Sequence, residues 1–404
     1  MTFLVRSRTA GVILTVMPEF DLDTLVDSVT PLLSDLFEVD AVYRHDDQIV
    51  FSITPRYNRK RSINLLKDRL KLAGYTFTLD YSQVPYVLGV DPKRRLRIPT
   101  LNIVLFVATL FSVYVVPVFL RNLFAQLELI AAADSTGAAG KIGLVRFLEL
   151  LFVPVLKGTA GDLAAGHGLV FTVALMSILI IHESGHFIAG RRRRIITSWP
   201  YFIPAPNIIG SFGAVIVQKT PFWNRRDLLE VGAAGPIAGW VVALVWLLWG
   251  LSQSTLVPVE EVPLKDVIPP LGWSIALLAS TKIIFGSIPQ DTVCVLSEAG
   301  FAGWVGLLVT AINLLPIGQL DGGHILYGLG RRLQHLLARL AVVGLVILGF
   351  QSFMWWIFAA LGLVFGLRHP PTLDDRRPPG RAATTLGIVS LVILVLSFTP
   401  APFG

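Results

Sequence analysis

Two things are scarce in this chain of 404 residues: cysteine and charge. The single cysteine, Cys294, excludes an intrachain disulfide and a zinc cluster built from several thiolates. Any bound metal must therefore be held by histidine and carboxylate side chains. Charged residues make up only 15% of the chain, whereas soluble domains carry about 25%. Together with 53% hydrophobic residues, this deficit places the chain among the membrane proteins.

The net charge of +7 would also suit a nucleic-acid partner. The basic residues, however, form short clusters beside apolar runs, which is the pattern of cytoplasmic membrane flanks. We therefore expect contact with membrane lipid and no nucleic-acid partner. The early apolar stretch, residues 11–17, is short and runs into acidic residues, so it predicts a strand and not a cleavable signal peptide.

The first 98 residues differ in composition from the rest of the chain. Their apolar periodicity predicts strands at 11–17, 40–44, 48–54 and 75–80 and helices at 23–36 and 62–72, with a tight turn at His45, Asp46 and Asp47. This βαββαβ order predicts a small α+β domain of the ferredoxin-like type over residues 1–98. We expect it to be regulatory or to serve in docking, in front of a second domain over residues 99–404.

Apolar runs dominate that second part and predict a mainly α-helical polytopic membrane protein with about seven transmembrane helices. The seven runs are 101–120, 169–188, 228–251, 299–315, 340–350, 353–367 and 386–398. The basic cluster at 93–97 places the N-terminal domain in the cytoplasm by the positive-inside rule. We expect an integral multi-pass protein of a prokaryotic cell membrane.

The run 273–288 is ambiguous, because it is almost long enough to cross a bilayer. Lys282 in its middle argues against a free-standing span. If the run only lies at the interface or re-enters, Arg331 and Arg332 fall on the cytoplasmic side, so we take it as interfacial or re-entrant.

A histidine pair lies inside the second apolar run. His182, Glu183 and His186 form the pattern H-E-x-x-H, and residues four apart share one helix face. Both imidazoles can then bind one zinc ion, with Glu183 placed to take a proton from water. The alternative is a buried histidine pair that hydrogen-bonds to neighbouring helices. Ionisable groups are costly in an apolar run, which favours the functional interpretation.

A zinc hydrolase usually has a third protein ligand, and Asp321 is the best candidate. It follows Pro316 and precedes Gly322 and Gly323, which interrupt the helix. His182 precedes its arginines by nine residues and Asp321 precedes Arg331 by ten. Both therefore lie about 13–15 Å from the inner surface if the two runs point the same way. A turn role for Asp321, or His324 as the ligand, remains as an alternative.

Two glycine-containing segments follow the histidine pair. The β-branched residues after Pro204 predict a strand or re-entrant hairpin whose open edge could add an extended substrate strand, or else an ordinary hairpin. The segment from Gly232 through Gly235 to Gly239 predicts close helix packing.

Taken together, these motifs resemble the site-2 protease family of intramembrane zinc proteases, in the prokaryotic and plastid-like branch without a PDZ insertion. The resemblance runs from about residue 165 to the C-terminus. It implies one zinc ion per chain, held by His182, His186 and Asp321, and a water activated by Glu183. It implies that Asn313 helps to hold the substrate or the developing oxyanion. It also implies that an unwound transmembrane protein substrate contacts a strand that includes Gly210, Ser211, Phe212, Gly213 and Ala214.

Two other functions stay open at this point. Intramembrane His, Glu and Asp also serve ion or proton transporters, and an inactive homologue could bind membrane partners only. The first predicts no stoichiometric zinc and no proteolysis. The second has no physical need to retain Glu183.

Overall fold

The computed structural model describes residues 12–13, 22–45, 48–94, 98–135, 144–193, 195, 197–218, 222–261, 271–289, 291–372 and 374–403. The chain forms two compact units. We call the first the N-terminal unit; it holds residues up to 99 together with 190–199 and 216–221. The second, which we call the helical unit, holds the rest.

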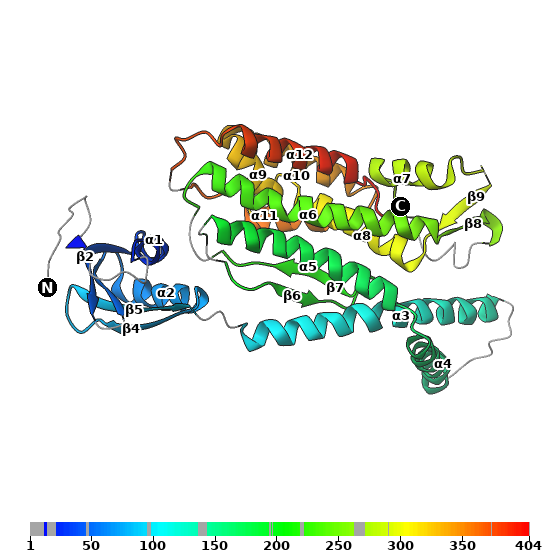
Figure 1. Ribbon diagram of the computed structural model, residues 1–404. Coiled ribbons are helices and arrows are strands. Elements are labelled where there is room, and N and C mark those ends of the chain that lie inside the picture. The colour runs from blue at the N-terminus through cyan, green and yellow to red at the C-terminus, as the bar shows by residue number, and fades with distance from the viewer. Residues whose placement is uncertain are drawn as a thin grey trace. The chain divides into compact units, whose positions relative to one another are not determined.

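The N-terminal unit is a five-stranded sheet with two helices (Figure 1). Its elements are β1 (Val12–Ile13), α1 (Leu22–Leu33), β2 (Phe37–His45), β3 (Gln48–Pro55), α2 (Arg59–Leu72), β4 (Tyr75–Asp80) and β5 (Tyr86–Arg94). The strand order is β1-β2-β3-β5-β4, and every pairing is antiparallel except that of β1 with β2.

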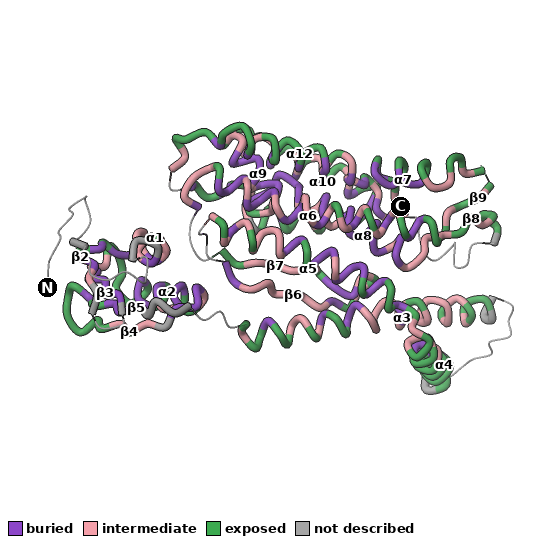
Figure 2. The backbone as a smooth tube through the Cα atoms, in the orientation of Figure 1, coloured by how far each residue is buried: buried purple, intermediate pink, exposed green. Residues whose placement is uncertain are grey.

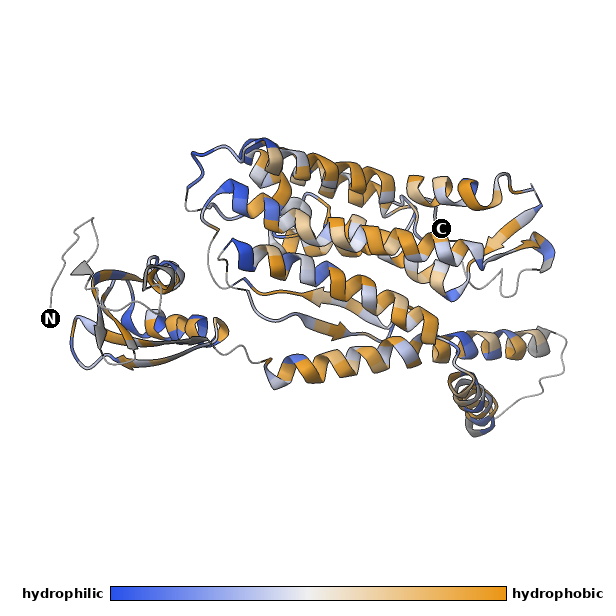
Figure 3. Ribbon diagram, in the orientation of Figure 1, coloured by the Kyte–Doolittle hydropathy of each residue, from blue (hydrophilic) through white to orange (hydrophobic). Residues whose placement is uncertain are grey.

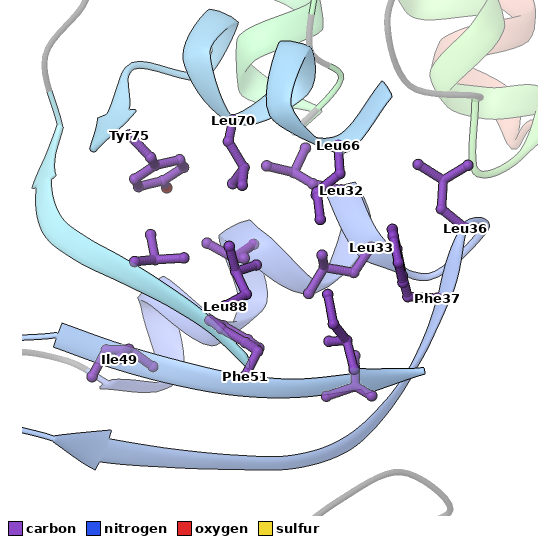
Figure 4. Close-up of a cluster of buried hydrophobic side chains, with 14 of the residues drawn as sticks. Leu32, Leu33, Leu36, Phe37, Ile49, Phe51, Leu66, Leu70, Tyr75 and Leu88 are labelled. Carbon is purple, nitrogen blue, oxygen red and sulfur yellow. The ribbon is translucent and has the colours of Figure 1, made fainter. Parts of the chain in front are cut away.

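Alternation along the strands gives this unit its core. Phe51 of β3 and Leu88 of β5 meet Leu66 of α2 in one buried cluster (Figure 4). The α2 helix is held further by Arg69, whose guanidinium forms two hydrogen bonds, of 2.5 and 2.7 Å, with the carboxylate of Asp35 beyond the end of α1. The unit therefore has the interior of an ordinary soluble α+β fold.

The predicted α+β region is confirmed, but one strand is missing from the prediction. β5 contains Gly89 and Pro92, residues that are depleted in strands. It pairs with β3 on one side and β4 on the other, and this pairing overrides its weak propensity. With β5 inserted between β3 and β4, the ferredoxin-like arrangement is not confirmed. The turn residues Asp46 and Asp47 and most of the first predicted strand lie outside the described residues.

The helical unit is a bundle with two short hairpins (Figure 1). Its helices are α3 (Thr100–Ser135), α4 (Leu144–Ala164), α5 (Leu169–Arg192), α6 (Arg225–Ser252), α7 (Ile275–Phe285), α8 (Glu298–Asn313), α9 (Asp321–Leu329), α10 (Arg331–Leu348), α11 (Met354–Phe365) and α12 (Arg381–Ser397), with a short 3-10 turn at Val259–Glu261. The hairpins pair β6 (Tyr201–Pro204) with β7 (Ser211–Val215) and β8 (Thr255–Pro258) with β9 (Thr292–Val295).

Many exposed residues of these helices are hydrophobic, as the colouring by burial and by hydropathy indicates (Figures 2 and 3). Three helices in the described part of the chain are long and apolar enough to cross a membrane, within Thr100–Ala132, Leu169–Arg192 and Arg225–Ser252. The other four predicted spans correspond to shorter helices: α8, α10, α11 and α12 have 16, 18, 12 and 17 residues. A helix needs about 20 residues to span the hydrocarbon core, so the count of seven is not confirmed. The prediction also missed α4.

Glycines bring α5, α6 and α8 into close contact. A Cβ atom added at Gly303 of α8 would lie 2.4 Å from the backbone nitrogen of Leu247, and one added at Gly300 would lie 3.3 Å from the backbone carbon of Gly250. Trp246 donates its indole N–H to Ser177 of α5 at 2.8 Å. A Cβ atom added at Gly239 of α6 would in turn lie 2.9 Å from Nδ1 of His182 on α5, so these pairs show that α5 and α8 both run antiparallel to α6. They therefore run in the same direction as each other, which the depth argument for Asp321 requires.

The ambiguous run 273–288 contains α7, which has 11 residues and is about 16 Å long. β8 follows α6 and β9 precedes α8, and these two strands pair with each other. The chain therefore leaves α6 and re-enters α8 at the same end of the bundle. A short helix between two paired strands agrees with an interfacial or re-entrant segment.

The β6–β7 hairpin packs against α3. Gly210, with a φ of 78°, ends the connecting loop in a left-handed conformation that favours glycine. A Cβ atom at this position would lie 2.5 Å from the Cα atom of Val113. Ser112 donates its hydroxyl to the carbonyl oxygen of Ala205 at 3.1 Å. The glycine in the predicted hairpin is thus required both by its backbone angle and by the contact with α3.

Candidate metal centre

The two histidines of H-E-x-x-H lie one turn apart on α5, with their rings turned toward one another. Their Nε2 atoms are 3.2 Å apart, and the ring centroids are 5.0 Å apart. His182 and Glu183 are both buried. This is the arrangement expected from residues four apart on one helix face.

Asp321 completes the cluster from α9. Its Oδ2 atom lies 3.3 Å from the Nε2 atoms of both His182 and His186. These three side chains offer ligand atoms within 4.8 Å of one another. A tetrahedral ion with bonds of 2.0–2.1 Å separates its ligand atoms by about 3.3–3.4 Å, so the three atoms fit zinc. Two nitrogen ligands and one oxygen ligand also leave the fourth position open.

A backbone carbonyl sets the orientation of His186. Its Nδ1 atom lies 2.8 Å from the carbonyl oxygen of Val231 on α6. Since a carbonyl only accepts, Nδ1 carries a hydrogen, and Nε2 is the nitrogen that faces Asp321 and His182 and would bind a metal ion. Metal-binding histidines are commonly fixed in this way through the second ring nitrogen.

Glycines of α6 make room for the imidazoles. A Cβ atom at Gly235 would lie 2.1 Å from Nε2 of His186, and one at Gly239 would lie 2.9 Å from Nδ1 of His182. These glycines were predicted to serve helix packing. The structure shows a more specific role, because the surfaces that they pack against are the rings of the metal centre. Beyond the small-residue pattern itself, no feature of the sequence indicates this role.

A tight loop between α8 and α9 places Asp321. Gly318 has a φ of 50°, and added Cβ atoms at Gly322 and Gly323 would collide with backbone oxygens of Leu314 and Gly318, at 1.9 and 2.2 Å. The loop can close only with glycine at these positions. Asp321 is then the first residue of α9, where the helix dipole favours a carboxylate.

A cavity of about 690 Å³ lies beside the centre within the helical unit. Asn313, at the end of α8, lines it, as do the hairpin residues Ser211, Phe212, Gly213 and Ala214 and the loop residues just before Asp321. Gly210 is not among the lining residues but forms the bend before them. Phe212 is 71% exposed, and within the described residues β7 pairs only with β6. The hairpin therefore presents an open strand edge and an apolar surface near the metal centre.

The structure thus brings His182, His186 and Asp321 together and leaves the alternative ligand, His324, outside this group. In the described part of the chain, Nδ1 of His324 lies 2.6 Å from Nε2 of His369 instead. His369, Tyr327 and Asp375 form a polar cluster there that the sequence prediction missed. Tyr327 lies more than 40 residues before the other two, so no local sequence pattern predicts that they meet.

Comparison with known proteins agrees with this geometry. Residues 170–355 match the model of peptidase family M50. The chain is 31% identical over 282 residues to "Probable zinc metalloprotease EGY2, chloroplastic" of Oryza sativa subsp. indica, covering 66% of this chain and 50% of the relative. It is 31% identical over 286 residues to the protein of the same name from Arabidopsis thaliana, covering 66% and 49%. No solved structure matches.

A further relative, "Probable zinc metalloprotease EGY1, chloroplastic" of Arabidopsis thaliana, is 30% identical over 238 residues, covering 56% of this chain and 42% of the relative. The chain thus spans about half the length of the curated relatives that it matches. Zinc is the metal that these relatives imply, and the matched segment contains His182, His186 and Asp321. Over residues 170–355, the chain therefore matches peptidase family M50, the site-2 protease family, and its relatives are named as zinc metalloproteases.

Proposed function

We propose that this protein is an intramembrane zinc endopeptidase that hydrolyses peptide bonds in or near transmembrane segments of other membrane proteins. The single observation that carries the proposal is the convergence of three ligand atoms from α5 and α9, 3.2–3.3 Å apart, inside an apolar bundle. In this proposal His182, His186 and Asp321 hold one zinc ion per chain. A bound zinc ion lowers the pKa of water toward 7 and polarises a carbonyl group.

The residues around the centre then have distinct roles. Glu183 takes the proton from the attacking water and passes it to the amine that leaves. The amide N–H of Asn313, at the end of α8, donates to the oxygen that gains negative charge at the scissile carbonyl. Burial favours both steps, because electrostatic interactions are stronger where water is excluded.

The hairpin supplies the substrate site in this proposal. A helical substrate hides its amides, so it must unwind before its backbone can be attacked. An unwound segment can pair with the open edge of β7 by strand addition, and its apolar side chains fit the cavity beside Phe212 and Asn313. Gly213, with a φ of 90°, and Ala214 keep this edge free of bulky side chains.

We further propose the domain layout expected from the sequence: a regulatory or docking domain over 1–98 and the protease over 99–404. About seven membrane spans and a cytoplasmic N-terminal domain, in a prokaryotic cell membrane, belong to the same proposal. The basic cluster at 93–97 supports the orientation. The relatives are named as chloroplastic proteins and lend no support to a prokaryotic membrane. Labelling of single engineered cysteines from either side of sealed vesicles tests this topology.

The test of the function uses the full chain in detergent or nanodiscs with a single-pass membrane protein as substrate. We expect one zinc per chain and cleavage that stops when a chelator removes the zinc. The variant Glu183→Gln should keep its zinc and lose activity by about 10²–10⁴-fold. Full activity in this variant would exclude Glu183 as the base. A protein without stoichiometric zinc that moves ions instead would indicate a transporter, and zinc without any cleavage would indicate an inactive homologue.

A further inference from the structure

A second cluster of buried polar side chains lies beside the metal centre and has no role in the proposed chemistry. It joins α9 to the α11–α12 connection, of which residues 366–372 and 374–380 are described. His324 of α9 meets His369 of the connection, with 2.6 Å between Nδ1 and Nε2. One turn later, Tyr327 donates its hydroxyl to Oδ2 of Asp375 at 2.6 Å.

The hydrogen bonds fix which nitrogen carries each hydrogen. Nδ1 of His369 lies 2.5 Å from the carbonyl oxygen of Pro370, which can only accept, so Nδ1 carries the hydrogen. Nε2 of His369 is then an acceptor, and His324 donates to it from Nδ1. Burial lowers the pKa of His369 to about 4, so at neutral pH the ring has the uncharged form that this arrangement needs.

The α11–α12 connection is itself held from several sides, so it can act as a fixed support. The backbone N–H of Asp374 donates to the carbonyl oxygen of Trp223 at 2.8 Å, just before α6 begins. Gln334 of α10 donates to the carbonyl oxygen of Leu367 at 2.8 Å. Thr372 donates its hydroxyl to Oδ1 of Asp375 at 2.6 Å, which orients that carboxylate toward Tyr327.

The α9 helix needs such a support more than its neighbours do. It has nine residues and no side-chain cap at its N-terminus, and a helix this short is marginal on its own. Its first residue is Asp321, whose carboxylate must stay in place for both imidazoles. His324 follows three positions later on the same side of the helix, so a shift of His324 also moves Asp321.

We propose that His369 is a positioning residue for the metal centre: its hydrogen bond with His324 holds α9 in the position where Oδ2 of Asp321 meets His182 and His186. The inference rests on the proposed function, because it assigns His369 to the zinc site defined there. This role of His369 differs from a purely structural one, because loss of its hydrogen bond with His324 should lower the affinity of the protein for zinc.

The test measures the dissociation constant for zinc of the full chain in detergent, by competition with a chromophoric chelator. His369→Leu keeps the side chain apolar and of similar size but removes the acceptor, and it should raise the zinc Kd about 10–100-fold. The visible absorption of the Co²⁺-loaded variant should also lose the intensity typical of a tetrahedral site. His369→Gln can accept from His324 through its amide oxygen, so its Kd should stay within about threefold of the native value.

Gln334→Leu is the matched control. It removes a buried hydrogen bond between α10 and the same connection, and it leaves the contacts between α9 and the connection in place. It should lower the Tm and leave the zinc Kd unchanged. Tyr327→Phe removes one hydroxyl from the same cluster and serves if His369→Leu fails to fold. We expect it to raise the zinc Kd by about threefold to tenfold, since one hydrogen bond to a charged group is lost.

A folded His369→Leu protein that binds zinc as tightly as the native chain would overturn the inference. So would a Gln334→Leu protein that loses zinc affinity to the same extent as His369→Leu. Absence of zinc from the native protein would instead refute the proposed function, so the two failures can be told apart.

Discussion

The two units of this chain distribute polar and apolar side chains in opposite ways. In the N-terminal unit, Phe51 and Leu66 are fully buried, and the exposed residues of α2 are mostly charged. In the helical unit, Val241 of α6 is 50% exposed and Ile283 of α7 is 74% exposed, while His182 and Glu183 are buried. The N-terminal unit therefore has an apolar interior, whereas the helical unit has a polar site inside an apolar exterior.

The difference follows from the solvent that each unit is built for. In water, burial of apolar area stabilises the fold, so the core is apolar. In a bilayer, lipid tails are as apolar as leucine, so burial of apolar side chains gives no such gain. Helices then associate through close packing at small residues, as α5, α6 and α8 do at their glycines. Polar groups are excluded from the lipid surface and gather inside.

The variant with the largest expected effect tests whether the glycines of α6 serve the metal centre or only helix packing. Gly235→Ala places a Cβ atom 2.1 Å from Nε2 of His186, at the atom proposed to bind zinc. We expect the zinc Kd to rise by at least about 100-fold. Gly344→Ala in α10 is the control, because its Cβ atom would meet nothing within 4 Å. Equal zinc binding in both variants would mean that the ring of His186 can move aside.

The variant with the next largest expected effect tests whether the N-terminal unit has its own apolar core. Leu66→Ala should destabilise that unit by about 2–5 kcal/mol, because a fully buried leucine leaves a cavity. Amide hydrogen exchange, read peptide by peptide, should speed up in α2 and the sheet. Leu65→Ala is the matched control, since Leu65 is 38% exposed. Retention of zinc in Leu66→Ala would show that the metal centre does not depend on this core.

A third experiment makes the same substitution on the outside of each unit. Val241→Arg should cost about 2.5–3.5 kcal/mol of membrane insertion, because Val241 is exposed in the middle of a membrane-length helix. Val87→Arg on β5 is expected to change stability by no more than about 0.5 kcal/mol, as for most exposed positions in water. Insertion assays and chemical unfolding measure the two quantities. Similar small effects at both positions would contradict the contrast between the units.

The site was predictable because its chemistry is local in the sequence. H-E-x-x-H needs only a helix to bring His182 and His186 together, and α5 supplies it. Asp321 lies far along the chain, but its glycines and its distance from the nearest arginines predicted that it comes near the histidine pair, and the structure brings the three side chains together. Strand β5 was missed for the opposite reason. Its place in the sheet depends on neighbours, since β5 is held by β3 and β4. The count of seven spans stays a prediction, because several of the helices concerned are shorter than a bilayer.

By itself, the sequence determined the membrane character of the chain, the histidine pair and the type of metal that suits it, because composition and helical spacing act over short distances. Only the tertiary structure decided that Gly235 and Gly239 face the imidazoles, that Val231 orients His186, and that His324 pairs with His369. These contacts join residues that are 45 to 57 positions apart. No local pattern encodes them, because they exist only once α6 and α9 have packed beside α5 and the α11–α12 connection has packed against α9.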